Sequence, residues 1–80
     1  MSDIELTKKQ NAKIQRAVKA LNDVRKEIQR ENPDYYLNWY LEDSNNLNLM
    51  EDHSHTGGDV ANFDAVIECF NLELAGGGGW

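Results

Sequence analysis

Cysteine and proline are scarce in this chain, which excludes an internal disulfide and leaves few interruptions of regular structure. Cys69 is the single cysteine of the 80 residues, so no internal disulfide can form. Secreted domains of this size normally need disulfides for stability, and we therefore expect a protein of a reducing compartment, the cytoplasm. Pro33 is the single proline, so long stretches on either side of it are free to form regular structure.

Long apolar runs are also missing. No stretch approaches the roughly 20 apolar residues that cross a bilayer, and the first ten residues, MSDIELTKKQ, lack the apolar core of a signal peptide. We expect a soluble protein that does not associate with membranes.

Positive charge is absent from the second half of the chain. All eight Lys and Arg residues lie between Lys8 and Arg30, so residues 1–32 carry a net charge of +3. Residues 33–80 hold nine acidic residues and no base, which gives −9 and a total of −6. A partner of the second half should therefore be basic or metal-bearing, whereas only the first half could lie against an anionic surface.

The short length limits how much surface folding can bury. A chain of 80 residues buries only about 60% of its unfolded surface, so its stability margin is thin. Small size and the opposed charges of the two halves favour self-association, and we expect a homodimer.

Residues from about 7 to 32 are expected to form one long helix. Thr7 and Gln10 match a capping box, in which each side chain satisfies a free backbone N–H of the first turn. Pro33 ends the helix, because the residue before a proline is pushed out of the helical region. Apolar residues recur every three or four positions and predict a helix that docks on a sheet rather than a free-standing coiled coil. They are Ile14, Ala17, Val18, Leu21, Val24 and Ile28.

Residues from about 35 to 51 are expected to form a β-hairpin. Apolar and polar residues alternate over 35–41 and again over 47–51, and residues 43–46 (DSNN) have turn chemistry. The alternation predicts one core-facing set of side chains. This set comprises Tyr35, Leu37, Trp39, Leu41, Leu47 and Leu49.

The last third of the chain is less regular. Residues 52–63 are expected to form a polar loop, and residues 75–80 a glycine-rich tail. Residues from about 64 to 74 fit a helix with Asp59 as its N-cap, or a third strand with a bulge near Glu68. We favour the strand, with Phe70, Leu72 and Leu74 facing the core. The fold expected is α+β, one long helix packed on a three-stranded antiparallel sheet in the order α-β-β-β.

The opposite face of the hairpin is the first candidate site. No second layer covers it in so short a chain, and Tyr and Met residues left on an open sheet are typical of protein interfaces. The alternative is that residues 52–62 fold over this face. The candidate contact residues are Tyr36, Asn38, Tyr40, Glu42, Asp43, Asn48 and Met50.

The polar loop and the tail form the second candidate site. His53, His55 and Asp59 are metal-ligand types, but they lack the fixed spacing of a zinc signature. Gly57 and the glycines of the tail expose backbone N–H groups, and Trp80 offers a ring on which a nucleotide could stack. No Ser or Cys stands in an activating motif, so we expect neither catalysis nor a cofactor.

The helix carries a basic stripe on the side opposite its apolar face. Nucleic-acid binding would need a second basic patch with interleaved aromatic residues, and the acidic half would repel a phosphate backbone. A solvated face is the favoured interpretation. The stripe comprises Lys8, Lys9, Lys13, Arg16 and Lys19.

Three segments together resemble a known class of proteins. The start LTKKQNAKIQRAVKALN, the middle NLNLMEDHSH and the end AGGGGW resemble small accessory proteins of tailed bacteriophages in layout and length. This resemblance implies a host-takeover or anti-defence factor, which acts in the host cytoplasm by blocking a host protein or by sequestering a signalling molecule. We therefore expect a non-catalytic protein that binds a basic host protein through its acidic sheet. A small-ligand or nucleotide sequestering protein is the alternative, followed by a metal-dependent enzyme.

Overall fold

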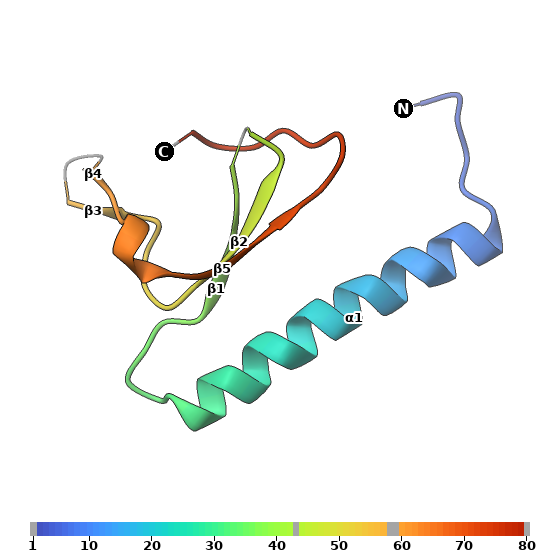
Figure 1. Ribbon diagram of the computed structural model, residues 1–80. Helices are drawn as coiled ribbons and strands as arrows, with labels where there is room; N and C mark the ends of the chain where they lie inside the picture. Colours follow the sequence, from blue (N-terminus) through green and yellow to red (C-terminus); the bar gives the residue numbers. More distant parts are fainter. Residues whose placement is uncertain (1, 43, 58–59, 80) are drawn as a thin grey trace.

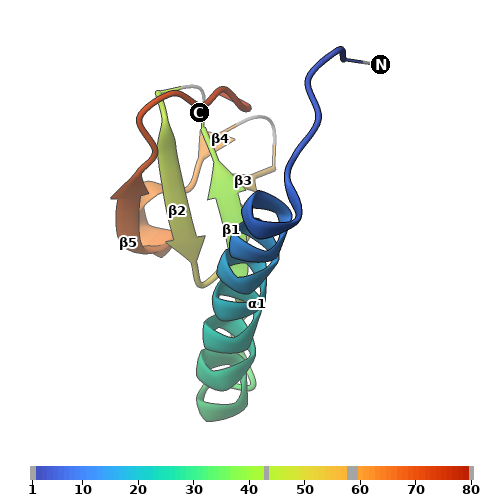
Figure 2. The ribbon, with the colours of Figure 1, turned by 90° about the vertical axis from the view of Figure 1, so that its right-hand side faces the viewer.

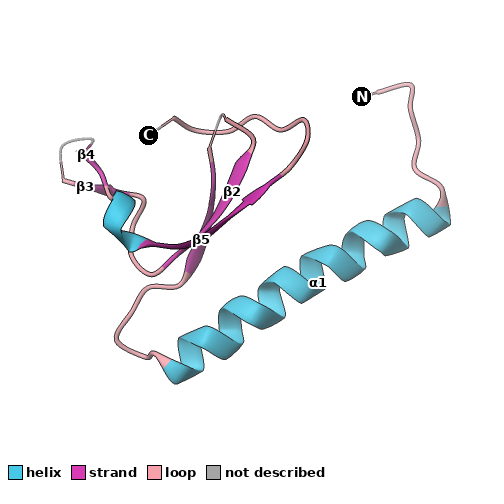
Figure 3. Cartoon of the chain, in the orientation of Figure 1, coloured by secondary structure: helices cyan, strands magenta, loops and turns pink. Residues whose placement is uncertain are grey.

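The computed structural model describes residues 2–42, 44–57 and 60–79, and it has an α+β architecture (Figures 1 and 3). Helix α1 spans Lys8–Glu31, and the strands are β1 (Asn38–Leu41), β2 (Asn46–Met50), β3 (His55–Thr56), β4 (Val60–Ala61) and β5 (Val66–Asn71), with a short 3-10 turn η1 at Phe63–Ala65. Strands β1, β2 and β5 form an antiparallel sheet in the order β1-β2-β5, and β3 pairs with β4 in a separate small hairpin. The expected fold class is confirmed.

Helix α1 begins and ends at the expected residues. The Thr7 hydroxyl accepts a hydrogen bond from the Gln10 backbone N–H, and the Gln10 side chain accepts one from the Thr7 N–H, so the predicted capping box is present. At the other end the Asn32 N–H donates to the carbonyl oxygens of Ile28 and Gln29 immediately before Pro33. None of the residues of α1 is fully buried.

The sheet has the predicted alternation. Trp39 lies opposite Leu49, and Leu41 lies opposite Leu47, in the register of β1 with β2. Residues 66–71 form a strand rather than a helix, and the register of β5 with β2 shifts where Glu68 faces Leu49 and Val66 faces Met50. The predicted strand and its bulge are therefore confirmed.

The predicted orientation is correct for Phe70, which lies opposite Leu47 and meets the Trp39 ring, but the expected burial of Phe70, Leu72 and Leu74 is wrong. Phe70 and Leu72 are 49% and 45% exposed, and Leu74 is 97% exposed. The chain leaves the sheet after Asn71, where the Leu72 N–H donates to the Asn45 carbonyl oxygen. Asn45 adopts a positive φ of 69° and also accepts the Ala75 N–H through its side chain, so it turns the chain back toward β1. Leu74 lies on the outside of this turn and has no core to enter.

Helix α1 docks on the sheet only through its C-terminal half. The Gln29 side-chain amide donates to the Tyr35 carbonyl oxygen at 2.7 Å and accepts the Leu37 N–H at 3.1 Å. The Trp39 indole N–H donates to the Leu21 carbonyl oxygen at 3.3 Å. Toward its N-terminus the helix diverges from the sheet, as Figures 1 and 2 show from two sides, and Ile14 is 50% exposed there. The expected packing of the whole apolar face is thus realised over only half its length.

The core lies in the sheet itself and involves both of its faces. Leu37 and Leu49 are buried on the face toward α1, in agreement with the sequence. Met50 is fully buried and Asn48 is 3% exposed on the opposite face, which was expected to be open. Residues 52–57, residues 60–62 and the described part of the glycine tail lie on the side of the sheet away from α1 (Figure 1).

Candidate functional site

The expectation of an open sheet face is wrong for three of its residues. Met50, Asn48 and Glu42 are buried. Their positions on the strands were predicted correctly, but the loop supplies the second layer that the hairpin alone lacks. This is the alternative in which residues 52–62 fold over the sheet.

Two histidines hold that loop on the sheet. The His53 ring lies against Tyr36 with centroids 4.4 Å apart, and the His55 ring meets Tyr40 edge to face at 6.0 Å. Asn38 adds a hydrogen bond from its amide to the Asp52 carbonyl oxygen at 3.0 Å. Asn38, Tyr40 and His55 are half-buried in consequence, whereas Tyr36 keeps 51% of its surface exposed.

The glycine tail closes the other end of the same face. The Gly78 N–H donates to the Leu41 carbonyl oxygen at 3.2 Å, and Gly78 forms a parallel bridge with Glu42. The Tyr40 hydroxyl donates to the Gly79 carbonyl oxygen. Gly77 packs so closely on β1 that a Cβ added there would lie 2.2 Å from the Leu41 carbonyl oxygen. The tail is therefore part of the fold, and its glycines permit close backbone approach.

The described residues do not form a set of metal ligands around His53 and His55. His53 and His55 each face a tyrosine, and no group of three His, Cys, Asp or Glu side chains within residues 2–42, 44–57 and 60–79 is arranged to hold a metal ion. Asp43, Asp59 and Trp80, which were candidate site residues, lie outside the described residues.

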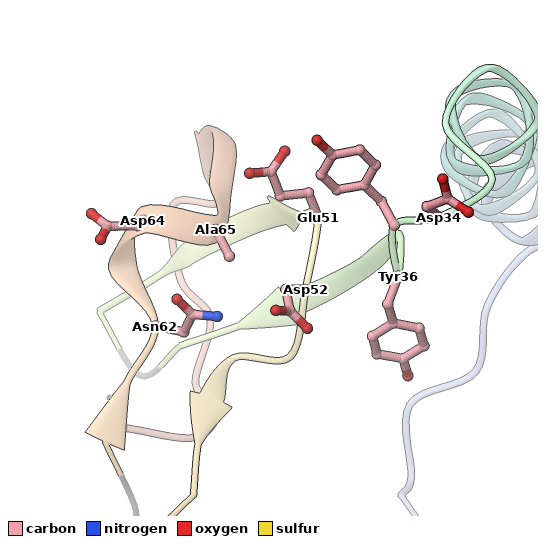
Figure 4. A pocket seen from close by; sticks show the side chains of 8 residues that line it. Asp34, Tyr36, Glu51, Asp52, Asn62, Asp64 and Ala65 are labelled. Carbon is pink, nitrogen blue, oxygen red and sulfur yellow. The ribbon is translucent and has the colours of Figure 1, made fainter.

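A pocket beside Tyr36 gathers acidic side chains from three parts of the chain, and we call it the acidic pocket (Figure 4). It has a volume of about 440 Å³, and its described lining contains four carboxylates and no base. Asn62 and Asp52 point toward each other across it, whereas Asp64 points outward (Figure 4). The lining residues are Asp34, Tyr35, Tyr36, Glu51, Asp52, Asn62, Asp64 and Ala65.

Backbone hydrogen bonds fix the segments that line the acidic pocket. The Tyr36 N–H donates to the Glu51 carbonyl oxygen at 3.1 Å, and the Glu51 N–H donates to the Ala65 carbonyl oxygen at 2.9 Å. These bonds extend the β1-β2-β5 ladder by one residue beyond β2. The Asn62 amide donates to the His53 carbonyl oxygen at 3.1 Å, which ties the loop to the same frame. The pocket is preformed by the ends of the strands.

Sequence reasoning recognised Tyr36 but missed the pocket as a whole. The pairing of Asn38 with Met50 places Tyr36 near Glu51 and Asp52, so part of the pocket follows from the register of the hairpin, which the sequence analysis did not specify. The contribution of Asn62 and Asp64 depends on the path of the loop and on η1, which no local pattern indicates.

The basic stripe of α1 lies on the far side of the helix from the sheet and is solvent-exposed. Lys19 and Asp23 form an exposed ion pair at 2.6 Å, and this hydrogen bond from Lys19 lowers the pKa of Asp23 below its ordinary value of 3.8. No helix among the described residues is long and apolar enough to span a bilayer. Comparisons with protein-family models, with curated proteins and with solved structures gave no match for this chain.

Proposed function

We propose that this chain is a non-catalytic binding protein that engages a basic segment of another protein through the acidic pocket. The observation that carries the proposal is a preformed pocket of about 440 Å³ with four carboxylates and two tyrosines in its described lining. A guanidinium or ammonium group fits this lining, because it forms ion pairs with carboxylates and also packs on the faces of aromatic rings.

The size and wall chemistry of the pocket favour an organic cation over a metal ion. A divalent metal requires oxygen or nitrogen ligands that converge within about 2.0–2.6 Å of one point, and the described residues contain no such group. Tyr35 and Tyr36 are each 51% exposed, so their rings are accessible to the stem of an Arg or Lys side chain.

The charge of the second half extends this preference beyond the pocket. The −9 of residues 33–80 would steer the chain toward a basic surface, such as one that handles nucleic acid. The resemblance to phage accessory proteins suggests that the partner is a host protein and that occupying its basic surface inhibits it in the cytoplasm. Dimerisation is part of the proposal and uses a separate surface between α1 and the sheet.

Nucleotide sequestration by the loop and tail has less support. The Gly78 N–H already donates to the Leu41 carbonyl oxygen, and both histidines of the loop contact tyrosines. No cationic side chain from the second half of the chain is present to neutralise a phosphate.

The test compares two double variants with equal net charge. Asp34→Asn/Glu51→Gln neutralises two walls of the acidic pocket, and Asp3→Asn/Glu73→Gln removes the same charge outside it. The probe is a fluorescent octa-arginine peptide, whose binding is followed by anisotropy at low and moderate salt. We expect the pocket variant to bind about tenfold more weakly, a loss of about 1.4 kcal/mol, and the control to bind within about twofold of the wild type.

Equal weakening by the two variants would contradict the proposal, because binding would then follow net charge alone. Thermal unfolding of both variants at the wild-type temperature is the control for folding. A host protein captured from lysate by the wild type and the control, but not by the pocket variant, would identify the partner.

A further inference from the structure

We propose that the N-terminal half of α1 from a second copy of this chain packs on the apolar side chains that α1 and the sheet leave exposed, so that two chains form a closed dimer. The starting observation is an apolar face that is covered over only half its length. Leu21 and Ile28 are half-buried where α1 meets the sheet. Ile14 and Val18 continue the same helical face and remain 50% and 49% exposed.

The sheet presents a matching uncovered surface. Trp39 connects α1 with the sheet. Its indole N–H donates a hydrogen bond to the Leu21 carbonyl oxygen of α1, and its ring centroid lies 6.3 Å from that of Phe70 in β5. Phe70 itself is 49% exposed. We call Ile14, Val18, Trp39 and Phe70 the apolar wedge. It is continuous with the core at Trp39 and opens toward the N-terminus of α1.

The surface area of the chain is larger than that of a compact monomer. The chain exposes 6349 Å², whereas a compact protein of 9.1 kDa exposes about 4,900 Å². The surplus of about 1,400 Å² exceeds the roughly 800 Å² that one partner contributes to a standard interface. Part of the surplus lies on the N-terminal segment, residues 2–7, which projects from α1 (Figure 1), and part lies on exposed apolar side chains of α1 and β5.

The shape agrees with this surplus. The radius of gyration is 14.8 Å, whereas a compact chain of 80 residues has a radius of about 12 Å. The principal extents of 41 × 28 × 20 Å describe an elongated molecule with α1 along one side.

Charge selects a second copy as the occupant. Glu68 pairs with Leu49 across β5 and β2 and therefore lies on the sheet face that bears Trp39, where it is exposed. The basic stripe lies on the same half of α1 as Ile14 and Val18. Lys19–Asp23 is the one ion pair within the described ranges, so Glu68 and most of the stripe have no ion-pair partner among the described residues. The stripe lies on the side of the helix opposite the apolar face, so it stays solvent-exposed in this contact. The basic N-terminal half of each helix nevertheless comes close to the acidic β5 region of the other copy, and the charges attract over this short range.

Two-fold symmetry closes this arrangement. Each chain supplies the N-terminal half of one helix and binds that of the other, so two identical contacts form. No unoccupied contact surface is left to which a third chain could add. The acidic pocket does not include any residue of the apolar wedge, so the two sites are independent. Loss of peptide binding and loss of dimerisation are therefore separable results.

The first test is sedimentation velocity over a hundredfold range of concentration, with two Val→Glu variants. We expect the wild type to sediment as a species of twice 9.1 kDa, with weaker association at about 500 mM than at about 50 mM NaCl. Val18→Glu should weaken association at least tenfold. Val60→Glu is the matched control, because Val60 is 58% exposed on the β3–β4 hairpin, and it should leave association unchanged.

The second test locates the contact without disrupting it. A spin label is placed on Gln15→Cys/Cys69→Ser protein, because Gln15 is exposed on α1 beside Val18, and this protein is mixed with isotope-labelled wild type. We expect intermolecular line broadening at the amides of Glu68 to Leu72 in the labelled copy.

Three results would overturn the proposal. A wild-type monomer at all concentrations would exclude the dimer, and a dimer that Val60→Glu dissociates but Val18→Glu does not would place the contact elsewhere. Broadening confined to α1 or to the β3–β4 hairpin would show that the sheet does not receive the helix.

Discussion

Gly77 has a specific structural role at the residue scale, because it lets the tail lie directly on the backbone of β1. A Cβ at this position would lie 2.2 Å from the Leu41 carbonyl oxygen, a distance that real Cβ atoms do not show. Gly76, its neighbour, has nothing within 4 Å of an added Cβ. The two glycines look equivalent in the sequence, and only one of them is required.

We predict that Gly77→Ala releases the tail and that Gly76→Ala does not. The Gly77 variant should lose the hydrogen bond from Gly78 N–H to Leu41, and it should be destabilised by about 1–3 kcal/mol, the usual range for forced overpacking. Hydrogen exchange at Gly78 and thermal unfolding measure the two effects. Gly76→Ala should be neutral or slightly stabilising. Equal behaviour of the two variants would show that the tail does not pack on β1.

Met50 shows what residue-level reasoning could and could not provide. The alternation of residues 47–51 placed Met50 on the face opposite Leu49, and this is correct. Whether that face meets solvent depends on the path of residues 52–62, where short strands of two residues leave almost no periodic signal. A methionine next to an open face and one beneath a loop have the same local sequence. Met50 is consequently a core residue in this fold rather than a surface anchor.

Gln29 is the main polar link between elements. Its side-chain oxygen accepts the Leu37 N–H, and its amide donates to the Tyr35 carbonyl oxygen. Arg25 adds a longer hydrogen bond to the Leu37 carbonyl oxygen at 3.3 Å. Because Leu37 is only 2% exposed, its backbone N–H has little access to replacement water.

We predict that Gln29→Ala costs about 1–3 kcal/mol, the penalty for leaving a buried donor without a partner. Gln15→Ala is the matched control, because the Gln15 side chain is exposed and bonds only Asn11 within the helix. Urea unfolding measures the cost, and faster exchange of the Leu37 amide would assign it to this contact. A Gln29 variant as stable as the Gln15 variant would argue that α1 is held by apolar contacts alone.

Elements were predictable where a local signal repeats. The capping box, the apolar periodicity and Pro33 together defined α1, and alternation defined β1 and β2. The extent of helix docking was not predictable, since Ile14 and Leu21 have the same spacing pattern and differ only in how far they lie from the linker to β1. The acidic pocket was missed for a related reason, because η1 and the loop bring Asn62 and Asp64 to the ends of distant strands.

The whole molecule combines an incomplete internal packing with a strong charge separation. Half of the apolar face of α1 is exposed, and an isolated helical segment of this length is only marginally stable in water. All Lys and Arg residues lie in the segment of α1, and residues 33–80 contain acidic residues but no Lys or Arg, so the two charged regions of one chain are separated. The dimer proposed above would cover the exposed apolar face and bring regions of opposite charge together, and stability should then depend on association.

This dependence gives the last prediction, in which the unfolding temperature rises with protein concentration. A dimer that unfolds to two monomers gains about 1.4 kcal/mol per tenfold increase in concentration, or about 0.7 kcal/mol per chain. For a domain of this size, about 3–5 °C per tenfold increase is expected. Calorimetry over a hundredfold range measures it directly. The Val18→Glu variant, which removes the contact, should unfold at a lower temperature that is independent of concentration. A wild type with the same independence would show that the chain folds alone, and that the exposed face of α1 is tolerated without a second copy.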